Sequence, residues 1–420
     1  MQAVIISIGD ELTTGQNVDT NSAWLSRQLT AAGVAVIRHV TVGDDVSRIE
    51  TSFRHALTAA ELVIVTGGLG PTADDLTRQA LAAATDSPLE ENAEALAQIE
   101  AFFARWQRPL TASNRTQALA PRGSRIVHNP RGTAPGLWHE KGGRNLFALP
   151  GVPAEMKNMY AATIAPLVAK LAAGRATHIA RVLTFGMAEA RMGELIADLM
   201  VRGRHPLVGT TASEAVITVR IIATADSPDA ARELAQRDAA EVRQRLGDAV
   251  FGSDDDTLHG VVAAELLRRK LTIATAESCT GGLLATRLTD VPGSSDYFLR
   301  GYVTYSNQTK SELLGVPAQL IAEQGAVSAA VARAMAEGCR SVARTDMAIG
   351  ITGIAGPGGG SAEKPIGLVY VGLADADATE VNRLLLGEHL SRIEIRDRAV
   401  KNALNMLRLR CITTSGIAST

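Results

Sequence analysis

The stretch "ATAESCTGGLLATRL", Ala274–Leu288, contains the pattern that decides the fold of this chain. Apolar and β-branched residues lead into Ser278 and an amphipathic run follows it, so a strand passes into a helix at this serine. A second stretch, "VIVTGGLGPTADDLT" (Val63–Thr77), repeats the order of buried strand, glycines and helix start. Strands that alternate with helices predict a mainly parallel sheet flanked by helices. The expected fold class is therefore α/β.

Segments with different element orders divide the chain into domains. Residues 1–171 alternate short strands with helices, which predicts a Rossmann-like domain. Residues 172–252 read strand, helix, strand, strand, helix, which is the order of a small α+β module. Residues 257–410 return to an α/β pattern, and residues 411–420 are small and polar enough to predict a flexible tail.

Composition narrows the classes of function and location. A chain of 420 residues with 46% hydrophobic content can bury several cores. A net charge of −2 with interspersed acids and bases offers no field for nucleic acid, so no stable nucleic-acid partner is expected. The three cysteines fit neither a disulfide framework nor a paired zinc site. With no signal-peptide pattern and no apolar stretch of membrane-spanning length, we expect a cytoplasmic protein without a membrane partner.

Ser278 stands where a strand-to-helix turn places free N–H groups near developing negative charge. The chain offers no histidine in an obvious relation to this turn, so the candidate base is a lysine, and Lys310, after the strand "GYVTYSN", is the best placed. Each residue also has a structural interpretation. Ser278 is a favoured helix N-cap residue, and Lys310 alone is more often a solvated lysine. Cys279 is a nucleophile in principle but more often a small buried side chain.

A glycine-rich loop, "GITGIAGPGGG" at Gly350–Gly360, ends another apolar strand and includes Thr352. Such loops fit around phosphate or carboxamide groups through their backbone N–H groups, although a glycine-rich loop alone is a weak signal.

The motifs "ESCTGG", "YSNQTK" and "TGIAGPGG", in this order, resemble the C-terminal domain of the CinA family, the nicotinamide-nucleotide amidases. The resemblance implies hydrolysis of the carboxamide of nicotinamide mononucleotide to nicotinate mononucleotide and ammonia, with no cofactor at this site. It assigns Ser278 as the nucleophile, Lys310 as the general base and Thr352 as an assisting hydroxyl. The expected oxyanion and substrate contacts are Cys279, Thr280, Gly281, Gly353, Gly356 and Gly358.

The glycine loop of Val63–Thr77 suits phosphate, and the adjacent Asp74 and Asp75 suit a divalent metal cation. Acidic residues are also favoured at a helix start for electrostatic reasons alone, so the metal interpretation and the structural one stay open. Two further polar clusters, "GDELTTGQNVDTN" and "NPRGTAPG", are expected at the same carboxyl edge of the sheet. The expected nucleotide contacts are Gly67, Gly68, Gly70, Thr72, Asp10, Asn21 and Gly132.

These clusters, with "LPGVPAEM" (Leu149–Met156), resemble the N-terminal domain of the CinA family, which is related to molybdopterin-binding proteins of the MoaB and MogA type. "FGMAEARMGEL" (Phe185–Leu195) extends the resemblance through a small KH-like middle module. "TTASEA" (Thr210–Ala215) departs from the usual turn. The resemblance implies metal-dependent hydrolysis of ADP-ribose to AMP and ribose 5-phosphate, and a homodimer.

Two rival functions remain. In the first, the N-terminal domain binds or adenylylates a pterin, as its molybdopterin-binding relatives do. In the second, the protein binds nucleotides without turnover and regulates a partner in competence or the DNA-damage response. Intact Ser278, Lys310 and Thr352 count against the second rival for the C-terminal half only.

Overall fold

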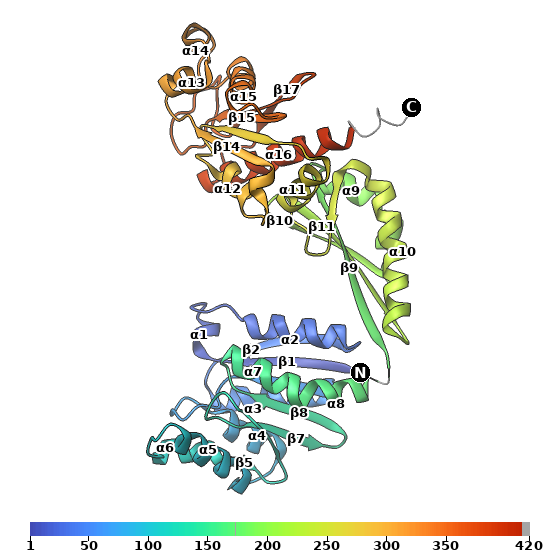
Figure 1. The fold of residues 1–420 in the computed structure, drawn as a ribbon. Coiled ribbons are helices and arrows are strands. Elements are labelled where there is room, and N and C mark those ends of the chain that lie inside the picture. The colour runs from blue at the N-terminus through green and yellow to red at the C-terminus, as the bar shows by residue number, and fades with distance from the viewer. Residues whose placement is uncertain (173, 414–420) are drawn as a thin grey trace. The chain divides into compact units, whose positions relative to one another are not determined.

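The structure, a computed structural model, describes residues 1–172 and 174–413 (Figure 1). Helices and strands alternate along most of this range, which confirms the expected mixed α/β class. Within the described ranges, none of the helices combines the length and apolarity that a membrane span requires.

The chain forms two compact units. The first unit contains Met1–Ile179 and Ile222–Ala235, and the second contains Ala180–Ile221 and the chain from Gln236 onward. The division passes through the middle module, whose long elements contribute residues to both units.

A mixed sheet forms the centre of the first unit. Its strands lie in the order β2 (Ala35–Val42), β1 (Gln2–Ile8), β3 (Leu62–Thr66), β8 (Arg144–Leu149), β7 (Gly136–Lys141) and β6 (Arg125–Val127). The pairs among β2, β1, β3 and β8 are parallel, whereas β7 and β6 are antiparallel additions. The turn Gly142–Gly143, with φ of 60° and 77°, joins β7 to β8 as a tight hairpin, which explains the change of direction.

Helices cover both faces of this sheet because β1 is apolar on both sides. Ala3 and Ile5 face one core, and Val4 and Ile6 face the other. The first core is closed by α2 (Thr20–Ala31), α7 (Pro153–Met159) and α8 (Ala165–Leu171). The second core is closed by α3 (Val46–Ala59) and α4 (Thr77–Thr85).

Shorter elements complete the first unit. They are α1 (Asp10–Thr13), the antiparallel pair β4 (Leu89–Glu91) and β5 (Leu119–Pro121), α5 (Ala93–Arg105) and α6 (Ala112–Arg115).

The middle module has the strand, helix, strand, strand, helix order predicted from the sequence, and a further strand that was not predicted follows the second helix. Its four-stranded sheet is ordered β10 (Leu207–Ser213), β11 (Val216–Ala225), β9 (Ala176–Phe185) and β12 (Val250–Ser253). Its helices are α9 (Glu189–Leu195) and α10 (Pro228–Leu246).

The second unit contains a five-stranded sheet. The strands lie in the order β14 (Phe298–Val303), β13 (Ile273–Glu277), β15 (Met347–Gly353), β16 (Leu368–Ala374) and β17 (Thr379–Leu385). The first three strands are parallel, and β16 and β17 are antiparallel to their neighbours. Because β14, β13 and β15 end at the same edge, the segments that follow them lie close together.

Helices also cover both faces of the second sheet. One core is closed by α11 (Leu258–Arg269), α12 (Leu283–Thr289) and α16 (Arg392–Thr413), and the other by α13 (Asn307–Leu314), α14 (Ala318–Gln324) and α15 (Ala329–Ala343). Helix α16 extends beyond the predicted boundary at residue 410, because Cys411 is buried in the first core. The expected tail is therefore corrected for its first three residues, and residues 414–420 lie outside the described residues.

Candidate functional site

The nucleophile predicted from the sequence and the predicted base are neighbours in the structure. Ser278 directly follows β13, and its backbone N–H donates to the carbonyl of Ile351 on β15 with an N···O distance of 3.0 Å. The Lys310 Nζ atom lies 3.2 Å from the Ser278 Oγ atom, within hydrogen-bond distance. Helix α13 brings this lysine to the turn, although the two residues are separated by 32 positions.

Lys310 is buried, with 1% of its surface exposed. Its ammonium donates to the Thr304 carbonyl at 2.8 Å and to the Ser306 carbonyl at 3.5 Å. Burial lowers the pKa of Lys310, because the desolvated ammonium loses the favourable hydration of its charge. The ammonium of Lys310 therefore loses its proton more readily than that of an exposed lysine.

Glu277, not Ser278, caps the helix that follows the turn. The buried Glu277 carboxylate accepts hydrogen bonds from the backbone N–H groups of Gly282, Leu284 and Ala285, at 3.1, 3.0 and 2.8 Å. The N-cap interpretation of Ser278 is therefore wrong, and its hydroxyl is left for Lys310. Sequence reasoning missed the role of Glu277, although a carboxylate before a glycine-rich helix start was a visible signal.

Cys279 is poorly suited to be the nucleophile. Its side chain is 7% exposed, and burial raises the pKa of the thiol to about 12, so the thiolate is scarce at neutral pH. Its backbone lies in the turn after Ser278. The Gly281 N–H donates to the Ser278 carbonyl at 3.1 Å, and the Cys279 N–H interacts with its own thiol.

Thr352 lies on β15 and is 1% exposed. Its hydroxyl donates to the Ala326 carbonyl at 2.8 Å, so its proton is engaged in this bond. Of the glycines in the following loop, Gly353 packs against Leu368 and Val369, and Gly356 has a φ of 73°. A side chain at Gly358 would meet no neighbouring atom.

Two arginines at the start of α16 join this site, and the sequence analysis did not single them out. Arg392 donates to the Gly356 carbonyl at 2.7 Å and to the Tyr305 hydroxyl at 2.9 Å. Arg396 donates to the Thr280 carbonyl from both Nη2, at 2.6 Å, and Nε, at 3.2 Å. They place two positive charges beside the nucleophile turn and the glycine-rich loop.

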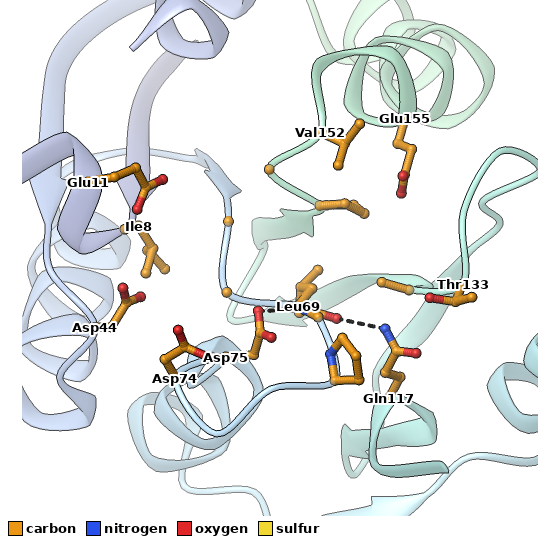
Figure 2. Close-up of a pocket in the computed structure, with 18 residues that line it drawn as sticks. Ile8, Glu11, Asp44, Leu69, Asp74, Asp75, Gln117, Thr133, Val152 and Glu155 are labelled. Carbon is orange, nitrogen blue, oxygen red and sulfur yellow. Dashed lines mark hydrogen bonds between the residues drawn. The ribbon is translucent and has the colours of Figure 1, made fainter. Parts of the chain in front are cut away.

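The first unit contains a cavity of about 420 Å³ at the carboxyl edge of its sheet (Figure 2). The glycine loop after β3, the segment after β1, and the segments around residues 133 and 151 form its walls. Five carboxylate side chains line it, from Glu11, Asp44, Asp74, Asp75 and Glu155. Of the residues predicted for this site, Gly67, Gly68, Gly70, Asp74 and Asp75 border the cavity.

Asp75 braces the glycine loop. Its Oδ1 atom accepts from the Gly70 N–H at 2.6 Å, and its Oδ2 atom accepts from the N–H of Thr72 at 2.9 Å and from the Thr72 hydroxyl. Both carboxylate oxygens are thus engaged within the loop, and Thr72 serves the same internal bracing. Asp74 has an exposed carboxylate that faces the cavity (Figure 2).

Asp44 lies within a group of closely spaced carboxylates. Burial raises its pKa, and the charges of Asp10, Glu11 and Asp74 raise it further, although a hydrogen bond from the Asp10 N–H opposes them. No set of three or more His, Cys, Asp or Glu side chains in the described ranges is already arranged around a metal position. The carboxylate oxygens fit a hard divalent cation by their chemistry, because such a cation relieves their mutual repulsion.

Gly67 and Gly68 are required by the packing of the protein itself. Their φ angles are 108° and 65°, and an added side chain would contact the Ile8 carbonyl or the Thr77 hydroxyl. Behind the loop, the buried Arg78 donates to the carbonyls of Leu69 at 2.8 Å and of Gly70 at 2.5 Å. Burial lowers the pKa of Arg78 to about 10, so it stays charged, and sequence reasoning missed it.

The other predicted contacts lie around this cavity. Asn21 donates to the Thr66 hydroxyl and the Gly151 carbonyl, and it lines an adjoining cavity of about 310 Å³. The Asp10 carboxylate accepts from the Asp44 N–H at 3.1 Å. The Gly132 N–H donates to the Asn129 side chain at 3.1 Å, beside Glu155.

Family models match three consecutive parts of the chain. Residues 4–170 match a probable molybdopterin binding domain, residues 181–252 match the damage-inducible protein CinA KH domain, and residues 255–411 match the CinA C-terminal domain. The fold and sites thus define a protein with a molybdopterin-binding-type domain, a KH-like module and a CinA C-terminal domain.

Similar proteins span the whole chain. A putative competence-damage inducible protein of Moorella thermoacetica is 47% identical over 409 residues, covering 97% of this chain and 98% of its own. A CinA-like protein of Geobacter sulfurreducens is 45% identical over 416 residues, covering 98% of this chain and all of its own. A solved structure of a competence/damage inducible protein from Agrobacterium tumefaciens is 42% identical, covers 36% of this chain and 92% of its own, and has a TM-score of 0.36. The chain belongs to the CinA family.

Proposed function

We propose that the second unit hydrolyses the carboxamide of nicotinamide mononucleotide. The observation that carries this proposal is the 3.2 Å contact between the Ser278 Oγ atom and the Nζ atom of the buried Lys310, whose pKa is lowered by desolvation. The choice of substrate rests on the family resemblance. The positive charges of Arg392 and Arg396 support it, because they are suited to the phosphate of a mononucleotide.

Hydrolysis of the carboxamide would begin when Ser278 loses its hydroxyl proton. Lys310 Nζ takes the hydroxyl proton as Ser278 Oγ attacks the carboxamide carbon, and the backbone amides of the turn after Ser278 stabilise the oxyanion. Lys310 then returns the proton to the leaving nitrogen, which departs as ammonia and leaves an ester on Ser278. A water molecule attacks this ester, its proton passes through Lys310 to Ser278, and nicotinate mononucleotide is released.

The test measures ammonia from nicotinamide mononucleotide with the full chain in the presence of EDTA. Wild-type protein should release ammonia, and Ser278→Ala and Lys310→Met should lose at least about 100-fold in rate, the scale expected for a nucleophile or general base. Lys170→Met, an exposed lysine of α8, is the matched control and should retain full activity. No ammonia from wild type would rule out the amidase proposal.

We propose that the first unit hydrolyses ADP-ribose to AMP and ribose 5-phosphate with a divalent cation. The carboxylates that crowd Asp44 support this proposal, because a bound cation would offset their charge and draw a diphosphate into an otherwise acidic cavity. Asp74 and Asp44 would offer carboxylate oxygens to the cation, with water completing its coordination, while Asp75 and Arg78 fix the loop beside it.

AMP release from ADP-ribose, measured with added Mg²⁺ or Mn²⁺ and then with EDTA, tests this second activity. Metal-dependent AMP release that Asp44→Asn abolishes would support it and disfavour the pterin-binding rival. If ADP-ribose binds but is not cleaved with any divalent cation, the nucleotide-binding regulator becomes the better account of this unit.

A further inference from the structure

Helix α16 contacts both the proposed amidase site and the middle module within the second unit. Near its start, Arg396 holds the Thr280 carbonyl, in the turn that follows the nucleophile. Further along the same helix, the Lys401 ammonium contacts Glu214, in the turn between β10 and β11. The "TTASEA" motif, which departs from the family pattern, ends in this turn and has no role in the proposed function.

The β10–β11 turn is conformationally strained. Glu214 and Ala215 have φ angles of 49° and 65°, a left-handed conformation that residues with a side chain adopt at a cost. Lys401 Nζ donates to the Glu214 carbonyl at 2.8 Å and lies 3.2 Å from the Glu214 carboxylate. These contacts hold the turn against α16.

The contacts continue from Lys401 toward the nucleophile turn. Lys401 Nζ lies 2.7 Å from Asp397 Oδ2, and the Arg287 Nη2 atom lies 3.8 Å from Asp397 Oδ1. Arg287 belongs to α12, the helix that starts after the nucleophile turn. The Lys401 and Asp397 side chains are 17% and 20% exposed, so solvent screens this pair less than it would an ordinary surface ion pair.

Apolar packing joins the same two parts. Phe185 and Phe251 of the middle module belong to one buried cluster with Val400 and Leu404 of α16. Because interiors are densely packed, a helix held on both sides transmits a displacement at one end to the other.

We propose that the β10–β11 turn, anchored through Lys401, positions α16 and thereby the turn that carries Ser278. Lys401 is a positioning residue that acts through Arg396 and through the Asp397–Arg287 pair. The catalytic part of this inference rests on the proposed amidase function, but the structural coupling does not.

Hydrogen exchange of the full chain tests the coupling without reference to activity. Lys401→Met should lower the protection of backbone amides in residues 279–290 at least threefold, with peptides from α15 unchanged as a reference for global stability of the unit. Lys401→Arg should restore protection, because it keeps the charge and the donors. Glu214→Ala, which removes only an exposed carboxylate, should give a smaller loss in the same peptide, and Lys170→Met should give none.

Kinetics on nicotinamide mononucleotide provide the second readout. Lys401→Met should reduce kcat at least fivefold with KM within twofold, and Lys401→Arg should recover it. Unchanged exchange in residues 279–290 of both Lys401→Met and Glu214→Ala would overturn the proposal, as would a loss of protection spread equally over α15. If wild type shows no amidase activity but Lys401→Met still loosens residues 279–290, the amidase proposal fails and the coupling stands.

Discussion

At the scale of single residues, Lys310 determines how the proposed amidase responds to pH. Its desolvated ammonium has a lowered pKa, and only the neutral amine can take the serine proton. The rate should therefore rise with pH as this group loses its proton. The midpoint should fall below about 10.4, the ordinary lysine value. Measuring kcat/KM for ammonia release across pH 5–11 checks this, and a midpoint at or above the ordinary value would contradict it.

Replacement of Lys310 by arginine tests the same proton transfer while the positive charge is retained. A guanidinium does not deprotonate in this range, so Lys310→Arg should lose the pH-dependent rate by about 100-fold or more while nicotinamide mononucleotide still binds. Calorimetric binding beside ammonia release separates the two effects. Full activity of Lys310→Arg would show that the lysine acts only as a positive charge.

Asp44 should destabilise the metal-free first unit at neutral pH. Its pKa is raised in the folded protein, so the folded state binds more protons than the unfolded state and stability falls as pH rises through that pKa. Asp44→Asn should therefore raise the thermal midpoint at pH 7 in EDTA, with a smaller gain at pH 4, and reduce the gain from added Mg²⁺. Scanning calorimetry at both pH values measures this. A lower midpoint for the variant at pH 7 would contradict it.

At the scale of elements, the N-terminus of α12 is capped by the carboxylate of Glu277, which precedes the helix. Glu277→Ala would leave three backbone N–H groups at the helix start without their acceptor, at a cost of about 2 kcal/mol or more. The thermal midpoint of the second unit should fall, and ammonia release should fall with it because the turn after Ser278 loosens. Glu277→Gln keeps one acceptor oxygen and should be intermediate.

The glycine loop after β3 allows a matched comparison of strain. Gly68→Ala meets both a φ of 65° and the Thr77 hydroxyl, whereas Gly123→Ala, at a φ of 84°, meets no neighbour. The left-handed conformation alone costs about 1–2 kcal/mol. Gly68→Ala should abolish AMP release and leave ammonia release intact, while Gly123→Ala should retain both. If both variants lost AMP release to the same degree, the left-handed backbone conformation, and not the contact with Thr77 in the glycine loop, would account for the loss.

The elements and the Ser278–Lys310 pair could be predicted because they leave local patterns. Strand and helix periodicity gave the α/β order, and three spaced motifs identified the pair. The direction of β7 and the partners of Asp75 could not be predicted, because a sequence does not show which amide a carboxylate faces. Arg396 lies 116 positions from Thr280, so no local pattern connects them.

At the scale of the whole molecule, the two proposed activities use different units and different chemistry. In the full chain, Ser278→Ala should remove ammonia release and leave AMP release, and Asp44→Asn should do the reverse. EDTA should remove AMP release, as Asp44→Asn does, and should leave ammonia release unchanged. Both assays on one preparation measure this, and loss of both activities in either variant would indicate a single shared site.

The apolar cluster that α16 shares with the middle module limits where the chain can be truncated to give a soluble fragment. A fragment that starts at the linker before α11 would carry Val400 and Leu404, each 1% exposed, without Phe185 and Phe251 of the same apolar cluster. Uncovered apolar surface of this kind drives self-association. A stand-alone C-terminal fragment should therefore self-associate more than the full chain, and polar replacements of these two residues should reduce that self-association.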